Sequence, residues 1–393
     1  MTPPGILNDI LSRVTEVGRS LSFASDDRSE AKSANLRDLC ETLLSRQGEA
    51  TGLALGRELL DRYATLDEAG KRSFFHDLNT GFGVDREVLE HALAEWQAHE
   101  TDASARALHF ASEPRSQELV RRLNRAPGGI LDLVGMRSDL LRAVRADPEL
   151  MPLDRDFQHL FGSWFNRGFL ELRRIDWSTP AEILEKIIHY EAVHEINGWD
   201  DLRMRVAAPD RRLYAFFHPA LTNEPLIFVE VALTDGIPSA IGRILSEQRD
   251  ELDPSTATTA VFYSISNCQT GLRGVSFGNF LIKQVVEDLR SEFDSIRTFV
   301  TLSPVPGLRR WVEADIAKGE DGLLPAPMRE AAAAGKGHDG TPSTIDHLAE
   351  IAALYLVEAK SHQGLPVDPV ARFHLGNGAR LEQVNLGADL SER

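Results

Sequence analysis

The chain has 393 residues, of which 60 are acidic and 43 are basic, giving a formal net charge of −17. This length predicts about two domains, each large enough to bury a core of its own. Hydrophobic residues make up 42% and charged residues 26%, which excludes a wholly disordered chain, and the acidic balance argues against nucleic acid or an anionic membrane as a main partner.

Two cysteines, Cys40 and Cys268, are too few for a disulfide framework or a cysteine-rich zinc site. They predict reduced thiols in an intracellular protein. No apolar run approaches the roughly 18 residues of a membrane span, and Asp9 falls where a signal peptide would be apolar. We therefore expect a cytoplasmic protein with no membrane partner.

Residues 5 to about 160 carry apolar residues at helical spacing almost throughout. Glycine and proline interruptions divide this half into roughly six to eight expected helices. Thr65–Glu68 has the pattern of a capping box, in which Thr65 would begin a helix. No catalytic constellation stands out, and its scattered histidines are typical of surface or core positions. We interpret residues 1–163 as an all-α domain used for packing or oligomerisation.

The second half mixes strand and helix patterns, which predicts an α+β fold class with a mixed sheet. Runs of β-branched and aromatic residues predict strands at 169–175, 214–217, 226–233, 258–266 and 298–302. The run at 226–233 is apolar enough to be central in its sheet. A second capping box, at Thr179–Glu182 with Pro180 as the first helical residue, predicts a helix, and another helix is expected between the last two strands.

The segment that joins the last two strands begins NCQTGLRGVSFGNFLIK, residues 267–283. Gly271, Gly274 and Gly278 fall where a strand gives way to a helix, and the first N–H groups of such a helix favour a phosphate. Arg273 adds a positive charge to the same place. Glycines at such turns equally serve tight packing, so both interpretations stay open.

The same loop fits the G-x-S-x-G nucleophile elbow, with Ser276 as the nucleophile. Asp346 or Asp368, followed by His374, would complete the residue order of an α/β hydrolase. An elbow needs the strand to run straight into the serine, whereas about eight residues separate the two here. An acyl-CoA thioesterase or hydrolase that uses Ser276 is therefore the weaker alternative.

Two further motifs carry candidate catalytic groups. Ser303 precedes a proline in SPVPG, residues 303–307, which holds its backbone extended and presents the hydroxyl at a strand end. His374 lies in RFHLGNG, where the Asn-Gly turn predicts an imidazole at a strand end. Both patterns are also typical of structural positions. The spacing of His189 and His194 does not fit a zinc site, and no motif for a nicotinamide, flavin or ATP is present.

Five ordered blocks of the second half resemble the malonyl-CoA decarboxylase family. They are SWFNRGFLELRRIDWSTPA (163–181), YEAVHEINGWDDLRMRV (190–206), FYSISNCQTGLRGVSFGNFLIK (262–283), TLSPVPG (301–307) and VDPVARFHLGNGA (367–379). The resemblance implies a helical oligomerisation domain at residues 1–163, forming a dimer or tetramer, and an acyl-CoA-binding catalytic domain of the N-acetyltransferase (GNAT) type at 164–393. It also implies conversion of malonyl-CoA to acetyl-CoA and CO₂ with no metal and no organic cofactor.

The family's functional residues map onto this chain by motif. Ser303 matches the serine regarded as the catalytic proton acceptor, and His374 matches the histidine regarded as the proton donor. The loop expected to hold the CoA thioester consists of Arg273, Gly274, Val275, Ser276, Phe277, Gly278 and Asn279.

Tyr263, Ser264 and Ser266 on the preceding strand are weaker candidates, and Arg309 or Arg310 could contact the CoA phosphates. Members of the family usually continue beyond the point where this chain stops, and that segment normally supplies a further strand and a tyrosine near the acyl site. We therefore expect a catalytic domain that is truncated at its C-terminus, and a non-catalytic acyl-CoA-binding protein is a further alternative.

Overall fold

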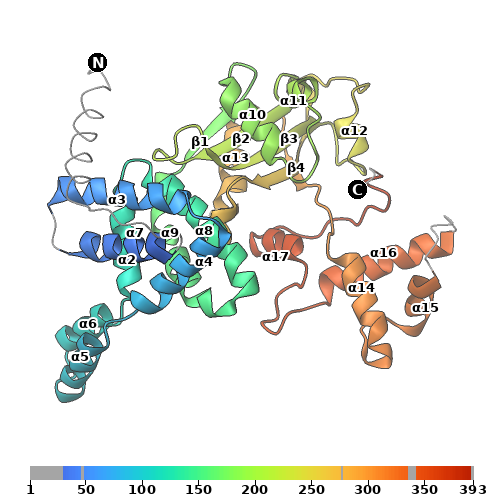
Figure 1. Cartoon of the computed structure of the whole chain (residues 1–393). Helices are drawn as coiled ribbons and strands as arrows, with labels where there is room; N and C mark the ends of the chain where they lie inside the picture. The colour runs from blue at the N-terminus through green and yellow to red at the C-terminus, as the bar shows by residue number, and fades with distance from the viewer. Residues whose placement is uncertain (1–29, 46–47, 276–277, 335–341, 391–393) are drawn as a thin grey trace. The chain divides into compact units, whose positions relative to one another are not determined.

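The structure, a computed structural model, describes residues 30–45, 48–275, 278–334 and 342–390. The chain divides into two compact units. Unit 1 comprises Met1–Glu171, Phe217–Leu226 and Cys268–Phe277, and unit 2 comprises Leu172–Phe216, Ile227–Asn267 and Gly278–Arg393. Figure 1 draws the helices of unit 1 in blue to teal and the strands of the sheet in green to orange.

Unit 1 contains the helices of the first half. Their bounds are α2 Glu30–Leu44, α3 Glu49–Ala64, α4 Glu68–His76, α5 Arg86–Ala98, α6 Asp102–Ala111, α7 Arg115–Asn124, α8 Gly129–Ala146 and α9 Met151–Trp164. Their apolar stripes bury a core that includes Phe75, Leu119 and Phe161. The helical prediction for this half is confirmed over the described residues.

Both predicted capping boxes are wrong, because neither threonine accepts a hydrogen bond from the helix that it was expected to begin. Thr65 ends α3, and Asp67 caps α4 by accepting the N–H of Gly70 at 2.8 Å. A carboxylate at this position also interacts favourably with the helix dipole, which a threonine does not. The hydroxyl of Thr179 instead accepts the N–H of Asp176 at 3.0 Å, and the following helix begins one residue after the proline.

Most of the five-stranded sheet, which has the order β1-β2-β3-β4-β5, belongs to unit 2. Its strands are β1 Glu171–Ile175, β2 Arg211–Phe217, β3 Pro225–Thr234, β4 Thr259–Asn267 and β5 Thr298–Thr301. Strand β4 is antiparallel to β3 and parallel to β5, so the sheet is mixed as predicted. β3 is buried along nearly its whole length, as expected of a central strand. The first strand is shorter than predicted, because Arg167–Phe169 forms a 3₁₀ turn.

The other helices belong to unit 2. Their bounds are α10 Ala181–Tyr190, α11 Trp199–Val206, α12 Gly242–Leu245, α13 Gly278–Glu292, α14 Leu308–Ala317, α15 Ala326–Ala334, α16 Pro342–Val357 and α17 Pro369–Gly376. Helix α13 is the predicted connection between the parallel strands β4 and β5, and it buries Leu281, Val285 and Leu289. Among the described helices, none is long and apolar enough to cross a membrane.

Candidate active site

Ser303 lies two residues beyond β5, where the chain leaves the edge of the sheet. Pro304 and Pro306 fix the backbone of the segment that follows and that leads into α14 at Leu308. The serine is half-buried, whereas both prolines are exposed. Its hydroxyl therefore stands on a stiff segment at the carboxyl end of an edge strand.

The predicted strand-end position of His374 is wrong, because His374 lies in helix α17. Oδ1 of Asp368 caps this helix by accepting the N–H groups of Val370 and Ala371 at 2.9 Å each. Pro369 occupies the first helical position, where the missing N–H of proline has no intrahelical role. The Asp-Pro start is the signal that outweighs the Asn-Gly turn, which follows the end of the helix.

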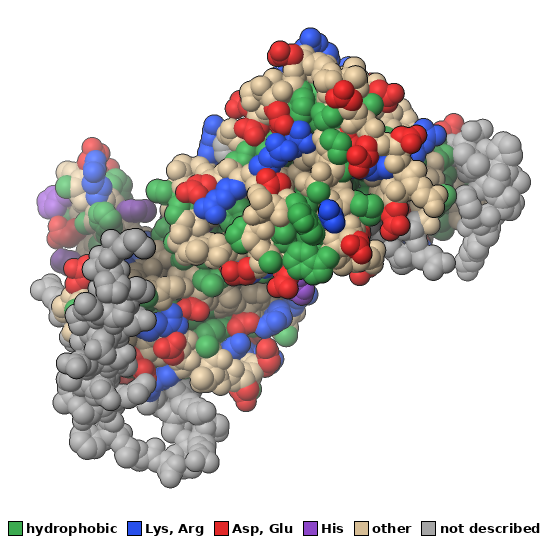
Figure 2. All heavy atoms as spheres, turned by 90° about the horizontal axis from the view of Figure 1, so that it is seen from above, with side chains coloured by type: hydrophobic (Ala, Val, Ile, Leu, Met, Phe, Trp, Pro, Cys, Tyr) green, Lys and Arg blue, Asp and Glu red, His purple; other side chains and the backbone are tan. Residues whose placement is uncertain are grey.

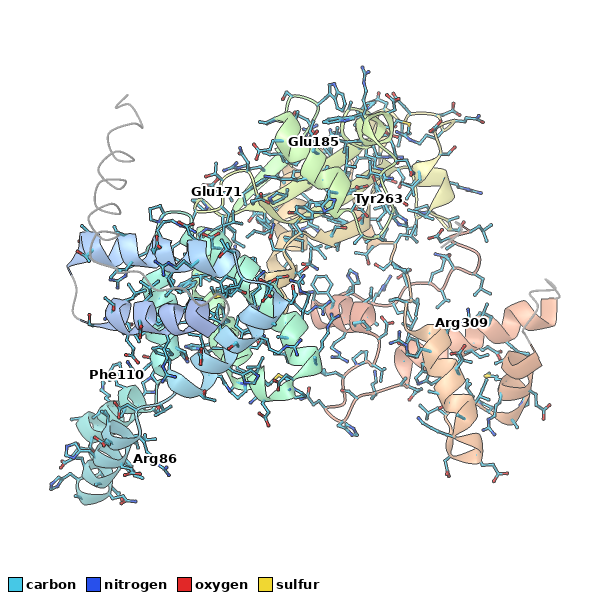
Figure 3. The ribbon with its side chains drawn as sticks, in the orientation of Figure 1. Arg86, Phe110, Glu171, Glu185, Tyr263 and Arg309 are labelled. Atoms are coloured by element: carbon cyan, nitrogen blue, oxygen red, sulfur yellow. The ribbon has the colours of Figure 1, made fainter. Side chains whose placement is uncertain are left out.

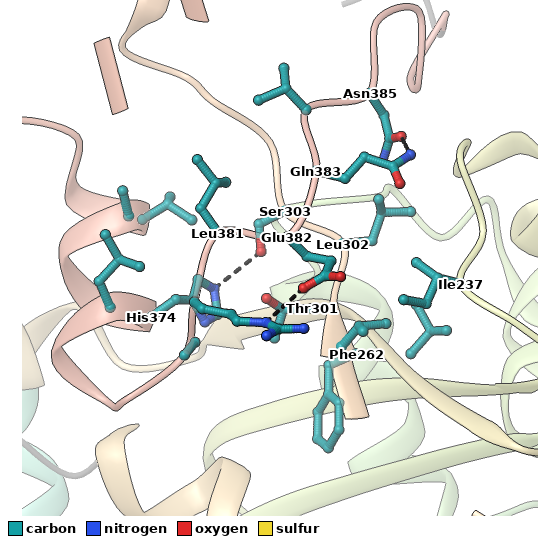
Figure 4. Close-up of a pocket in the computed structure, with 18 of the residues that line it drawn as sticks. Ile237, Phe262, Thr301, Leu302, Ser303, His374, Leu381, Glu382, Gln383 and Asn385 are labelled. Atoms are coloured by element: carbon teal, nitrogen blue, oxygen red, sulfur yellow. Dashed lines mark hydrogen bonds and ion pairs between the residues drawn. The ribbon is translucent and has the colours of Figure 1, made fainter. Parts of the chain in front are cut away.

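The Oγ of Ser303 lies 3.1 Å from Nε2 of His374, within hydrogen-bond distance (Figure 4). Burial lowers the pKa of His374, so its imidazole is neutral near pH 7. Within the described part of the chain, the second ring nitrogen makes no hydrogen bond and no carboxylate orients the ring. The two residues thus form a serine–histidine pair whose geometry allows a proton to pass between hydroxyl and imidazole.

The serine–histidine pair lies in a pocket of about 640 Å³ within unit 2. Strand β5, helix α17 and the segment 379–388 supply most of its wall. In the close-up of Figure 4, apolar side chains such as Phe262 and Leu302 lie near the pair. This volume is typical of sites that enclose a small organic ligand.

Two cations, Lys283 and Arg380, occur among the described residues that line this pocket. Arg380 pairs with Glu382 at 2.7 Å, an interaction drawn as a dashed line in Figure 4. Lys283 lies on α13 and has no ion-pair partner among the described residues. On the face shown in Figure 2, acidic side chains are interspersed with basic ones, so an anion meets individual cations rather than a basic field there.

The loop expected to hold CoA belongs to unit 1, and its glycines have structural roles. A Cβ on Gly271 would collide with the carbonyl oxygen of Val134 in α8, so only glycine permits this approach. Gly274 has a φ of +81°, and Gln158 donates a hydrogen bond to its carbonyl at 2.8 Å. At these two positions the structure supports the packing interpretation. Arg273 between them is exposed.

The rest of the loop is described only in part. The N–H of Val275 donates to the carbonyl of Leu272 at 3.0 Å, and Gly278 and Asn279 begin α13. Ser276 and Phe277 lie outside the described residues. A role of this loop in binding the CoA thioester stays a prediction.

Asp368 does not act as the carboxylate that the hydrolase alternative requires beside His374. That side chain caps α17 and accepts the hydroxyl of Tyr355, and within the described residues it makes no hydrogen bond to His374. A 3₁₀ turn at Thr270–Leu272 also separates β4 from Ser276, whereas an elbow has no such insertion. The side chain of Asp346 lies outside the described residues.

The three weaker candidates on β4 belong to an internal network of the sheet. Ser264 and Ser266 donate to the carboxylate of Glu191 at 2.7 and 3.0 Å. Tyr263 lies at a bulge beside Glu230, and burial raises the pKa of Glu230 to about 7. None of the three candidates is among the described residues that line the pocket.

Comparison with known sequences identifies the family of this chain. The sequence model of the malonyl-CoA decarboxylase C-terminal domain matches residues 168–393, more than half of the chain. This chain belongs to the malonyl-CoA decarboxylase family. The model of the family's N-terminal domain matches residues 82–165. Mitochondrial malonyl-CoA decarboxylase from Anser anser anser is 35% identical over 373 residues, which cover 84% of this chain and 73% of that protein.

Solved malonyl-CoA decarboxylases share the fold. The crystal structure of the Rhodopseudomonas palustris protein is 53% identical, with a TM-score of 0.86 over 91% of this chain and 89% of that one. The Agrobacterium vitis protein is 51% identical, with a TM-score of 0.85 over 91% and 88% of the two chains. The predicted family and the α+β class are confirmed.

Sequence reasoning missed Lys283 in the wall of the pocket and Tyr355, which contacts the pocket residue Asp368. Lys283 stands early in the helix that follows the glycine-rich loop, and this position is the signal that could have found it. Tyr355 lies in α16, within a stretch for which no element was predicted. Nothing in the local pattern around Tyr355 indicates its contact with Asp368.

Proposed function

We propose that this chain decarboxylates malonyl-CoA to acetyl-CoA and CO₂, with Ser303 and His374 as its catalytic pair. The observation that carries the proposal is the 3.1 Å separation of their side chains inside a pocket. The names of the family and of its similar members, malonyl-CoA decarboxylase, support the choice of substrate.

The reaction breaks the bond between the α-carbon and the carboxylate carbon of the malonyl group. The electron pair enters the thioester carbonyl, giving an enolate, so the substrate is its own electron sink. Apolar side chains in the wall, such as Phe262 and Leu302, favour the departure of uncharged CO₂ over a hydrated carboxylate. Hydrogen-bond donors aimed at the enolate oxygen would lower the barrier further.

The enolate carbon then takes a proton from the catalytic pair. In the proposed step, Nε2–H of neutral His374 gives its proton to Oγ of Ser303 while the serine hydroxyl gives its own to the α-carbon. The enolate of a thioester is a stronger base than imidazolate, so the transfer runs downhill, and neutral imidazole is a known donor in enolate chemistry. Solvent then restores the proton on the imidazole.

Lys283 is proposed to bind a phosphate of CoA rather than the malonyl carboxylate. An ammonium paired with the carboxylate would stabilise the substrate more than the transition state, in which that charge is leaving. A phosphate keeps its charge throughout the reaction, so its pairing with Lys283 stabilises the substrate and the transition state equally.

Turnover in D₂O tests the proposal. Protonation of an enolate by a group in exchange with solvent places one deuterium on the new methyl group of acetyl-CoA, which mass spectrometry detects. A thiol reagent in a parallel reaction reports free CoA. Acetyl-CoA that carries one deuterium, with no free thiol, supports decarboxylation, whereas free CoA and malonate would contradict it and favour the thioesterase.

Two serine variants separate these reactions further. Ser303→Ala removes the proposed relay and is expected to reduce kcat by about a hundredfold or more. Ser276→Ala is expected to stay within about threefold of the wild type, because the decarboxylase uses no nucleophile. The reverse ranking would favour the thioesterase.

We also propose that the protein is a cytoplasmic homo-oligomer. In the same proposal, a helical domain gives way near residue 163 to a domain of the N-acetyltransferase type. Helices α5 and α6 expose apolar side chains that support a helical interface: Val88 is 52% exposed and Leu93 41%. Phe110, which Figure 3 labels, is 71% exposed. Light scattering of the wild type and of Phe110→Asp tests the interface. A wild-type monomer would contradict it, and a smaller assembly in the variant would support it.

A further inference from the structure

Tyr355 and Asp368 form a buried hydrogen-bonded pair beside the pocket. The hydroxyl of Tyr355, on α16, donates to Oδ2 of Asp368 at 3.2 Å, and both residues are only 1% exposed. The ring of Tyr355 packs on Trp311 with ring centroids 5.1 Å apart. Burial and the neighbouring Asp368 raise the pKa of Tyr355 to about 12, so its hydroxyl remains a donor through the physiological range.

Both oxygens of the Asp368 carboxylate accept hydrogen bonds. Oδ2 accepts the tyrosine hydroxyl, while Oδ1 caps α17 through the N–H groups of Val370 and Ala371. The negative charge also lies at the positive end of the helix dipole. The start of α17, and with it the position of His374 farther along the same helix, is therefore fixed relative to Tyr355.

Gly307 connects the same tyrosine to the segment that carries Ser303. A Cβ on Gly307 would overlap the hydroxyl oxygen of Tyr355, and it would lie 3.4 Å from Oδ2 of Asp368. The backbone of Gly307 thus packs directly against the pair. Pro304 and Pro306 stiffen the short connection back to Ser303.

We propose that Tyr355, Asp368 and Gly307 form a clamp that sets the distance between Ser303 and His374. The clamp holds the serine segment on one side and the histidine helix on the other. Its members are positioning residues, since no hydrogen bond joins the clamp to the imidazole of His374 within the described residues. The catalytic consequence rests on the proposed function, because it presumes that the serine–histidine contact is used in turnover.

Tyr355→Phe tests the clamp by removing only the hydroxyl. We expect kcat to fall about tenfold or more and KM to change less than about twofold, because the substrate still binds while Ser303 and His374 move apart. Tyr214→Phe is the matched control: Tyr214 is also 1% exposed, but its hydroxyl has no hydrogen-bond partner among the described residues. Its kcat should equal that of the wild type.

Gly307→Ala supplies a rescue experiment. Alone, the added methyl group must displace the tyrosine hydroxyl, and kcat falls. In the double variant with Tyr355→Phe that oxygen is gone, and the nearest ring carbon would lie 3.3 Å from the new Cβ. The double variant should therefore be faster than Gly307→Ala alone, whereas losses that simply multiply overturn the clamp. Gly242→Ala, where a Cβ meets nothing within 4 Å, is the control.

The pKa of His374, measured by NMR titration of the imidazole, separates failure of the clamp from failure of the proposed function. The signal is assigned by its absence in His374→Gln, and no turnover is needed. Loosening the clamp exposes the ring, so Tyr355→Phe should raise this pKa towards its ordinary value. A shifted pKa supports the clamp even in a wild type without decarboxylase activity. An unchanged pKa of His374 in both Tyr355→Phe and Gly307→Ala overturns the clamp. If only one of the two variants folds, an unchanged pKa in that variant overturns the clamp.

Discussion

The side chains of Ser303 and His374 meet at 3.1 Å, although 71 positions separate the two residues in the chain. The contact brings the end of the edge strand β5 to helix α17 inside one unit of the fold. Nε2 is engaged with the hydroxyl and burial lowers the pKa of the imidazole, as the proposed proton transfer through the serine requires.

Replacing the imidazole should abolish turnover without abolishing binding. For His374→Gln we expect kcat to fall by about a hundredfold to ten-thousandfold, the usual contribution of general acid–base catalysis. Calorimetric titration with CoA should give a Kd within about threefold of the wild type, because the proposed role of the histidine is at the acyl group and not at the carrier. His362→Gln, at an exposed position, is the control. Undiminished turnover in His374→Gln would remove the histidine from the mechanism.

Activity should be lost on the acidic side of neutrality. Burial lowers the pKa of His374 below its ordinary value of about 6.5, and the neutral form is the proposed donor. kcat/KM should therefore be full above about pH 6.5 and should fall as the pH drops through the lowered pKa. A fall with rising pH between about 6 and 8 would instead identify the imidazolium as the donor.

The same shift in pKa makes stability depend on pH. Folded His374 binds fewer protons than the unfolded chain between the lowered pKa and about 6.5, so its contribution to stability rises with pH across this window. The contribution is fully present above about pH 6.5 and is lost as the pH falls to the lowered value. Urea denaturation across the window should show a shallower pH dependence in His374→Gln than in the wild type. Equal slopes would mean that burial does not shift this group.

Lys283→Ala should weaken substrate binding while leaving the chemical step intact. We expect KM to rise about tenfold and kcat to change less than about twofold, because a phosphate contact is equally strong in the ground and transition states. Lys283→Arg should restore most of the loss. Lys318→Ala, an exposed lysine near the end of α14, is the matched control. A loss confined to kcat would place the ammonium at the reacting group instead.

The glycine-rich loop should prove to be a packing element at Gly271. Gly271→Ala forces the loop away from the Val134 carbonyl and disturbs the 2.7 Å hydrogen bond from buried Arg137 to the carbonyl of residue 271. We expect the free energy of unfolding to fall by about 1–3 kcal/mol in urea denaturation. Gly135→Ala, on the same helix α8 as Val134 but in open space, should not be destabilising. A fully stable Gly271→Ala would contradict this role.

Local patterns predicted the elements whose side chains bury one face or both. The strands β3, β4 and β5 followed from β-branched and aromatic runs, and the helix expected between the last two strands is α13. Caps were harder, because each hydroxyl has several backbone partners within reach: Thr179 bonds to Asp176 rather than starting a helix. The true signal for α17 was Asp368 followed by proline.

The site itself was predictable only where a motif marked it. Ser303 and His374 were singled out by their motifs and given their roles by the family resemblance, and no spacing rule relates residues that meet through tertiary folding. The contact of Tyr355 with Asp368 had no local signal, because it depends on how α16 packs beside α17. Glycines in the loop had two valid physical explanations, and only the approach of Gly271 to Val134 distinguishes them at that position.

The central claim is that Ser303 and His374 act as one unit in malonyl-CoA decarboxylation. Its most direct test is the turnover of Ser303→Ala, of His374→Gln and of the double variant, each followed by acetyl-CoA formation in a mass spectrometer. Residues that share one proton transfer are strongly non-additive, so the double variant should be within about threefold of the slower single variant. A double variant slowed by the product of the two single losses would show that they act separately and would contradict the account.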